Sequence, residues 1–160
     1  MFAIVPVLFS SLAIAAAANA PVPFAHPLNG EGRATSGFGY RVDPFTGAKA
    51  FHSGLDIAAA QGTPVFAPKA GRIEAAGFDG PYGNRIQIDH GDAIRTVYGQ
   101  LSRIDVKPGD QVAQGQQIGT VGSSGRSTGP HLHFEVWEGE AAADPNPLIA
   151  WRSWGAVVPE

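Results

Sequence analysis

The sequence contains no cysteine, and this absence limits its chemistry. Disulfides, thiolate zinc sites and cysteine nucleophiles are excluded, so a transition metal could be held only by histidine and carboxylate side chains. The chain also lacks any cluster of lysine and arginine, and its formal net charge is −3. Both features argue against a nucleic-acid partner.

Long helical patterns are absent as well. Beyond residue 20, no stretch of ten or more residues shows an apolar period of 3.6 residues. Glycine (21 residues) and proline (13 residues) are abundant and follow no regular period, as is typical of turn-rich β proteins. The 160 residues are 44% hydrophobic, enough for one domain with a core. We expect a mostly β, monomeric single domain of antiparallel sheets with long Gly/Pro-rich loops.

Short β-like segments alternate with turn signals along the chain. The expected strands are residues 34–38, 64–67, 72–77, 85–89, 94–98, 117–121 and 131–137. Residues 101–104 are expected to form one helical turn.

Residues 1–20 are uncharged and end in the small residues Ala18-Asn19-Ala20. This pattern predicts a secretory signal peptide, although no lysine or arginine precedes the apolar run. An uncleaved anchor is the alternative, but the run is slightly short of the ~20 residues that span a bilayer. We therefore expect export to the periplasm or cell envelope, with no membrane span after processing. Residues 21–30 are expected to be an extended lead-in, 31–148 the domain and 149–160 a C-terminal tail.

Two of the five histidines lie one residue apart, at His131 and His133. In a strand, residues i and i+2 point the same way, so both imidazoles and the Glu135 carboxylate share a face. Upstream, His52 and Asp56 form a second pair, four residues apart. Either pair alone has an ordinary alternative, as hydrogen-bonded strand histidines or a surface pair. Their joint occurrence favours a metal site.

The two pairs together satisfy the needs of a catalytic zinc, which takes three protein ligands and leaves a fourth position open. His52, Asp56 and His133 would be the ligands, and His131 would act as general base and acid. Zinc in such a site lowers the pKa of a bound water toward ~7 and polarises a carbonyl. The HExxH helix of many zinc proteases is absent, so the arrangement is a different one.

Ordered motifs across the chain carry a family resemblance. They are SGFGYRVDPFTG (36–47), FHSGLD (51–56), GTPV (62–65), YGN (82–84), DHG (89–91), VKPGD (106–110) and GSSGRSTGPHLHFE (122–135). These motifs strongly resemble those of the M23 (lysostaphin/LytM-type) zinc metallopeptidases over about residues 26–148. The resemblance implies a LytM-like fold with a groove over a zinc site.

The resemblance also implies roles for individual residues. Zinc ligands fall on His52, Asp56 and His133, and a catalytic histidine falls on His131. The implied activity is zinc-dependent endopeptidase hydrolysis of peptide cross-links in bacterial peptidoglycan, which fits an exported protein. Both D-alanyl–diaminopimelate cross-links and glycine bridges are conceivable substrates. The type of the expected signal peptide favours the D-alanyl–diaminopimelate cross-links.

One residue departs from the family pattern. A second catalytic histidine is expected after Tyr98-Gly99, where this chain has Gln100. Glutamine cannot take up and release a proton at neutral pH, but its amide can donate a hydrogen bond to an oxyanion or orient water. We expect Gln100 to serve in catalysis in this way, with weakened activity. The alternative is a zinc-binding pseudoenzyme that binds peptidoglycan or regulates another cell-wall hydrolase.

Other residues carry simpler expectations. His90 is expected to be structural, and His26 incidental. Glu135 either orients a histidine or is a solvated carboxylate. Tyr40 and Arg41 either line the groove or pack in a turn, and Trp137, Trp151 and Trp154 are expected to pack on the domain.

Overall fold

The structure, a computed structural model, describes residues 24–151. The expected signal peptide, the first residues of the lead-in and nearly all of the tail, including Trp154, lie outside the described residues. Within residues 24–151, no helix has the length and apolarity that crossing a membrane requires. The described part is built of β-strands, with only two short 3-10 helices, η1 (Gly80–Tyr82) and η2 (Asn146–Leu148).

The strands of the described residues are short, with three longer ones at the centre of the fold. In chain order they are β1 (Phe24–Ala25), β2 (Arg33–Ser36), β3 (Gly39–Val42), β4 (Lys49–His52), β5 (Leu55–Ala58), β6 (Pro64–Phe66), β7 (Gly71–Phe78), β8 (Asn84–Asp89), β9 (Ile94–Leu101), β10 (Arg103–Ile104), β11 (Gln111–Val112), β12 (Gln117–Thr120), β13 (His131–Glu138), β14 (Ala141–Ala143) and β15 (Ile149–Ala150).

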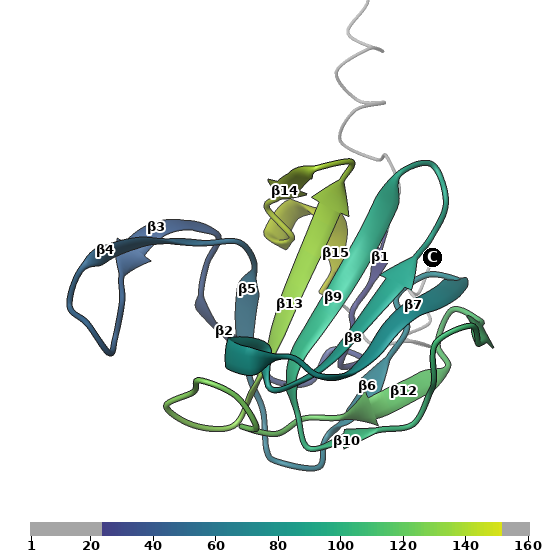
Figure 1. Cartoon of the computed structure of the whole chain (residues 1–160), viewed down its shortest axis with the longest axis horizontal. Helices are drawn as coiled ribbons and strands as arrows, with labels where there is room; N and C mark the ends of the chain where they lie inside the picture. Colours follow the sequence, from purple (N-terminus) through teal and green to yellow (C-terminus); the bar gives the residue numbers. More distant parts are fainter. Residues whose placement is uncertain (1–23, 152–160) are drawn as a thin grey trace, which may run out of the picture.

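The main sheet has eight strands in the order β11-β7-β8-β9-β13-β5-β2, with β14 paired to β13 (Figure 1). Its neighbouring strands pair antiparallel. A three-stranded sheet, β10-β12-β6, and the parallel pair β1-β15 supply further core residues. The expected mostly β fold of antiparallel sheets is therefore confirmed.

Alternation along β13 separates the core from the functional face. Leu132, Phe134 and Val136 are completely buried in the core, while the residues between them point to the other side of the sheet. Phe134 pairs with Tyr98 of β9, and the two ring centroids lie 5.4 Å apart. Such cross-strand aromatic pairs stabilise a sheet beyond the area that they bury.

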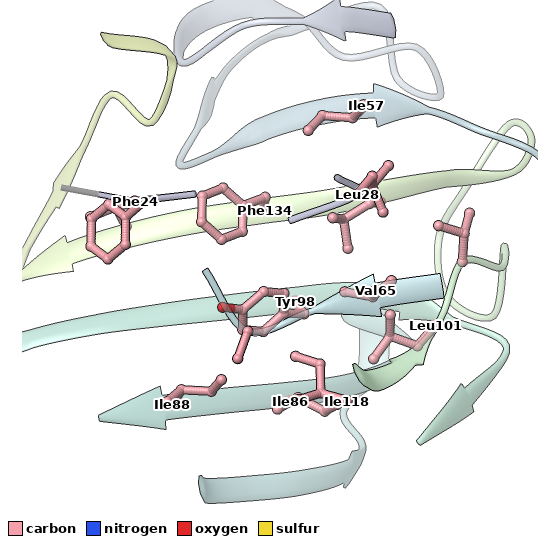
Figure 2. Close-up of a cluster of buried hydrophobic side chains, with 14 of the residues drawn as sticks. Phe24, Leu28, Ile57, Val65, Ile86, Ile88, Tyr98, Leu101, Ile118 and Phe134 are labelled. Atoms are coloured by element: carbon pink, nitrogen blue, oxygen red, sulfur yellow. The ribbon is translucent and has the colours of Figure 1, made fainter. Parts of the chain in front are cut away.

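The core continues across the sheet and into the smaller layer. Figure 2 shows Val65 of β6 and Ile118 of β12 beside the side chains of the main sheet, and both are completely buried. Burying one such aliphatic side chain contributes about 1.5–3 kcal/mol. This packing fixes β5 and β13, the two strands that carry most of the candidate site.

The β3-β4 hairpin projects beside the main sheet as a separate two-stranded sheet (Figure 1). Its register places Gly39 opposite His52 and Tyr40 opposite Phe51. The outer face carries Tyr40 and Phe51, both more than half exposed. His52, one position further, is buried on the opposite face and points to the main sheet.

All seven expected strands occur, with ends that differ from the expected ones by at most three residues. The helical turn expected at residues 101–104 is wrong. Leu101 still belongs to β9, where it pairs with Asn84 and is completely buried. The next residues form β10, which pairs with β12. Pairing with distant strands overrides the local sequence here.

His26 is structural, and the expectation that it is incidental is wrong. Its side chain is 1% exposed, and Nδ1 accepts a hydrogen bond from the backbone N–H of Leu28 at 3.1 Å. Its ring also meets that of Trp151 edge-on, with centroids 5.0 Å apart. Burial lowers the pKa of His26 to about 4. A protonated Nδ1 could not accept this bond.

Acidification is therefore expected to destabilise the domain through His26. The unfolded imidazole binds a proton near its ordinary pKa of 6.5, before the folded one at about 4. The contribution is thus complete above about pH 6.5 and is lost as the pH falls toward 4, by up to about 3 kcal/mol. His26→Asn keeps an acceptor but does not titrate. Denaturant unfolding from pH 7 to 4.5 should show the wild type losing about 2–3 kcal/mol more than this variant; equal losses would contradict the prediction.

Candidate active site

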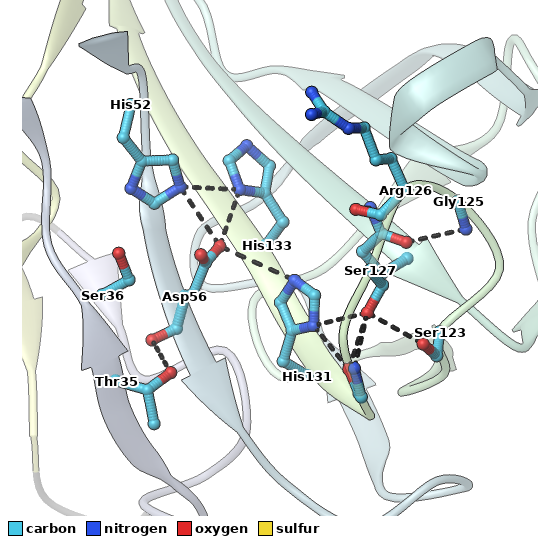
Figure 3. A network of polar contacts seen from close by, with 12 residues as sticks. Thr35, Ser36, His52, Asp56, Ser123, Gly125, Arg126, Ser127, His131 and His133 are labelled. Carbon is cyan, nitrogen blue, oxygen red and sulfur yellow. Dashed lines mark hydrogen bonds and ion pairs between the residues drawn. The ribbon is translucent and has the colours of Figure 1, made fainter. Parts of the chain in front are cut away.

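Three side chains from two parts of the chain converge at one end of the main sheet (Figure 3). Asp56 of β5 pairs in register with His133 of β13, so both point from the same face. His52 comes from the end of β4, directly before the turn into β5. One ligand atom from each lies within 4.8 Å of the other two. The three residues predicted as metal ligands are thus brought together.

The hydrogen bonds of the two histidines leave lone pairs facing one another. Nδ1 of His52 donates to the carbonyl of Gly37 at 2.7 Å, and Nε2 of His133 donates to Glu135 at 2.8 Å. Because each of these partners can only accept, the remaining ring nitrogens carry no proton when the rings are neutral. These two nitrogens lie 3.2 Å apart.

A carboxylate oxygen completes the set of acceptors. Oδ1 of Asp56 lies 3.2 Å from Nε2 of His52 and 2.9 Å from Nδ1 of His133. Atoms bound to one tetrahedral zinc at about 2.05 Å are about 3.3 Å apart, close to these separations. Three acceptors that lie this close together favour a metal ion or a proton between them. This set of ligand atoms therefore fits zinc, which binds imidazole and carboxylate ligands.

The pKa shifts of Asp56 and His133 also indicate that the cluster stabilises a positive charge. Burial opposes ionisation of Asp56, but hydrogen bonds from His133 and His52 outweigh it and hold its pKa well below the ordinary range. Burial likewise works against protonation of His133, yet the neighbouring Asp56 and Glu135 carboxylates raise its pKa to about 9. A proton fits between these groups when no metal is bound, so metal binding and protonation compete.

Arg41 of β3 holds the other oxygen of Asp56. Its guanidinium donates to Oδ2 at 3.2 Å and also to the hydroxyl of Ser36. The carboxylate is therefore fixed with Oδ1 toward the histidines. Of the two residues expected to line the groove, Arg41 does so, whereas Tyr40 does not line it and is 72% exposed on the outer face of the hairpin.

Glu135 orients His133, and the alternative of a solvated carboxylate is wrong because the side chain is only 1% exposed. Besides His133, it accepts hydrogen bonds from the hydroxyls of Ser53 and Tyr82, at 2.6 and 2.8 Å, and from Nε1 of Trp137 at 2.6 Å. Burial alone would raise its pKa, but these donors, His133 first, lower it to about 2. Such partners fix the tautomer of a ligating histidine.

The turn that brings Ser53 to Glu135 depends on one glycine. A Cβ on Gly54 would lie 2.5 Å from the carbonyl oxygen of Phe134 and 2.9 Å from Cγ of Glu135. Only glycine lets the β4-β5 turn approach β13 this closely. The sequence indicates the FHSGLD motif, but not this contact, because its partner lies 82 residues further along.

His131 lies beside the cluster without joining it. Nδ1 donates to the carbonyl of Gly129 at 2.8 Å, with the hydroxyl of Ser127 at 3.2 Å (Figure 3). Nε2 is therefore the unprotonated nitrogen of the neutral ring, and it lies 3.7 Å from Oδ1 of Asp56. The ring is partly exposed and lines the adjoining cavity. This placement suits a group that exchanges protons at the site.

Gln100 lines the same cavity, but its amide group is engaged elsewhere. Nε2 donates to the backbone carbonyls of Pro81 at 2.9 Å and Arg126 at 3.4 Å, and Oε1 accepts from the backbone N–H of Gly125 at 2.7 Å. Donation to an oxyanion would require one of these bonds to break. The expected catalytic role of Gln100 stays a prediction.

Two cavities adjoin at the cluster and together form the groove. One, of about 280 Å³, is lined by His52, His133 and the hairpin residues Arg41 and Phe51. The other, of about 560 Å³, is lined by β2 and the loop before β13. Both include Arg41, Asp56 and His131 in their walls. An extended chain can therefore pass the cluster on both sides, as the expected groove requires.

The remaining histidine outside the site behaves as expected. Nδ1 of His90 donates to the carbonyl of Ala70 at 2.8 Å, and Nε2 lies 2.7 Å from the hydroxyl of Thr96. Burial lowers the pKa of His90, which keeps the ring neutral. His90 is a structural residue and takes no part in the cluster.

Known proteins are similar to this chain in sequence and fold. DD-carboxypeptidase/endopeptidase Mpg of Neisseria meningitidis is 48% identical over 104 residues, which are 65% of this chain and 24% of that protein. Peptidoglycan DD-endopeptidase ShyA of Vibrio cholerae is 42% identical over 113 residues, 69% of this chain and 26% of that protein. The chain thus spans about a quarter of the length of these curated relatives.

Solved structures extend the likeness to the fold. The catalytic domain of lysostaphin from Staphylococcus simulans matches with a TM-score of 0.66 and 38% identity, covering 75% of this chain and 92% of that one. A zinc-containing peptidase from Vibrio cholerae matches with a TM-score of 0.66 and 39% identity, covering 70% of this chain and 35% of that one. The family model described as Peptidase family M23 matches residues 50–145, which include all three predicted ligands and His131. The chain therefore belongs to peptidase family M23.

Proposed function

We propose that the protein is a zinc endopeptidase that hydrolyses peptide cross-links of peptidoglycan outside the cytoplasm. The observation that carries the proposal is the convergence of one ligand atom each from His52, Asp56 and His133, beside the imidazole of His131 in an open groove. The relatives named as peptidoglycan DD-endopeptidases support D-alanyl cross-links as the substrate. The leader expected at residues 1–20 fits this location.

His52, Asp56 and His133 would hold the zinc. When bound, the ion supplies a Lewis acid for the scissile carbonyl and makes a water molecule acidic enough to react at neutral pH. The groove orients the substrate peptide across the cluster, and water then adds to its carbonyl carbon. Arg41 and Glu135 keep the ligands in place, since they fix the free oxygen of Asp56 and the outer nitrogen of His133.

His131 carries the proton in this proposal. Its Nε2 takes a proton from the attacking water as the new C–O bond forms. It then delivers that proton to the peptide nitrogen as the C–N bond breaks, so that one carboxyl and one amine end result. The bond from Nδ1 to Gly129 holds the ring in the tautomer that this requires.

A digest of purified peptidoglycan tests the proposal. The zinc-loaded full chain is incubated with peptidoglycan that contains D-alanyl–diaminopimelate cross-links and, separately, with peptidoglycan that contains glycine bridges. We expect mass spectrometry to show new peptide termini from the first substrate, and none after chelation. If no new termini arise although one zinc per chain is bound, the protein is instead a zinc-binding module.

A further inference from the structure

We propose that Gln100 is a positioning residue that holds the loop carrying the support of His131 and does not itself touch substrate. This inference rests on the proposed function, because it concerns the residue that moves the proton. Gln100 is 5% exposed and adopts a positive φ of 66° near the end of β9. A residue other than glycine tolerates this backbone only when its surroundings hold it there.

The side chain of Gln100 joins two segments that are far apart in sequence. Its amide bonds the carbonyl of Pro81 in η1, while its oxygen and its second N–H bond Gly125 and Arg126 in the loop 122–130. A direct bond from the N–H of Arg126 to the carbonyl of Pro81, at 2.9 Å, runs alongside. Gln100 thus adds its three hydrogen bonds to this direct bond at the point where the loop 122–130 crosses η1.

The crossing leaves no room for a side chain at position 125. A Cβ on Gly125 would lie 2.3 Å from the carbonyl oxygen of Pro81 and 2.4 Å from the backbone nitrogen of Gly83. On the far side of the crossing, the hydroxyl of Ser124 accepts from the N–H of Asn84 at 2.9 Å. The two segments are therefore in backbone contact. Gln100 forms hydrogen bonds with backbone polar groups at this contact.

From the crossing, a short path leads to the proposed base. Two residues beyond Gly125, the hydroxyl of Ser127 contacts both the carbonyl of Gly129, at 2.7 Å, and Nδ1 of His131, at 3.2 Å (Figure 3). The carbonyl of Gly129 fixes the tautomer of His131. Displacing the loop at Gly125 would therefore displace the group that keeps the lone pair of His131 on Nε2.

The chemistry of the amide explains why glutamine suits this position. Two N–H donors and one carbonyl acceptor match two carbonyls and one N–H. A neutral imidazole offers only one donor and one acceptor. A histidine at position 100 could satisfy at most two of the three partners of Gln100, and it would leave one buried polar group unpaired.

The test compares Gln100→Met, which keeps the length but makes no such bonds, with Gln61→Met at an exposed glutamine. In the zinc-loaded full chain, Gln100→Met should keep one zinc and exchange the amide hydrogens of residues 122–130 at least about tenfold faster. The kcat should fall about 10–100-fold with KM nearly unchanged, as for a misplaced group. Gln61→Met should match the wild type in every measurement.

Two further measurements separate positioning from direct contact. Nitrogen NMR of His131 should show the Nδ1–H tautomer in the wild type and a mixture in Gln100→Met. The kcat losses of Gln100→Met and Ser127→Ala should be strongly non-additive, since both act through the same loop. Additive losses, unchanged exchange in Gln100→Met, or a kcat of Gln100→His above the wild type would overturn the inference. If the chain hydrolyses no peptidoglycan, the proposed function fails, while exchange and tautomer still decide the role of Gln100.

Discussion

Replacing Asp56 by asparagine is expected to remove zinc and hydrolysis together. The carboxylate is the only anionic ligand, and both histidines face its Oδ1 at 2.9–3.2 Å. An amide keeps the shape but loses the charge, so the affinity for a divalent cation should fall by several orders of magnitude. Metal analysis after dialysis should give less than one tenth of a zinc per chain, and peptidoglycan cleavage should fall to the uncatalysed background.

The matched control is Asp79→Asn, at a carboxylate that is 59% exposed and lies outside the groove. This variant should retain one zinc and wild-type cleavage. A folded Asp56→Asn protein that binds zinc as tightly as the control would show that the ligand set is wrong. Circular dichroism checks that the variant is folded. We expect the fold to persist, because Asp56 pairs with β13 through its backbone, which the substitution leaves unchanged.

Replacing His131 by alanine should slow turnover strongly and leave the zinc in place. Its Nε2 lies 3.7 Å from Oδ1 of Asp56, near the ligand atoms, while its other nitrogen is bound to Gly129. Loss of a general base typically costs about 10²–10⁴-fold in rate. We expect a decrease of this size in kcat, with one zinc per chain by metal analysis.

Zinc content distinguishes the two substitutions. Asp56→Asn should lose metal and activity, whereas His131→Ala should lose activity alone. The control is His90→Gln, at a partly buried histidine whose bonds go to Ala70 and Thr96 and not to the groove. Cleavage by His131→Ala within tenfold of the wild type would assign the proton transfer to another group.

The parts of the site that follow from local pattern were predictable. Period-two alternation in β13 places His131, His133 and Glu135 on one face, and the structure confirms it. The ligands His52 and Asp56 follow from the family motif that spans them. In each case the information lies within a few consecutive residues.

The parts that were not predictable depend on contacts between distant residues. The bonds of Gln100 reach residues 19 to 26 positions away, so its sequence neighbours give no sign of them. The same holds for His26, which looks like part of a proline-rich lead-in but is covered by Trp151. The helical turn expected at 101–104 failed because strand pairing with β8 and β12 decides that segment.

The metal cluster also links the β3-β4 hairpin to the main sheet. An isolated two-stranded hairpin is only marginally stable in water, and this one pairs with no strand of the main sheet. Its described side-chain links to the rest of the domain include His52, Arg41 at Asp56, and Asp43 at Arg126. A cation bound by His52 and by the two ligands on the main sheet would therefore hold the hairpin against that sheet. Chelation would then loosen one wall of the groove, coupling the shape of the binding surface to metal supply.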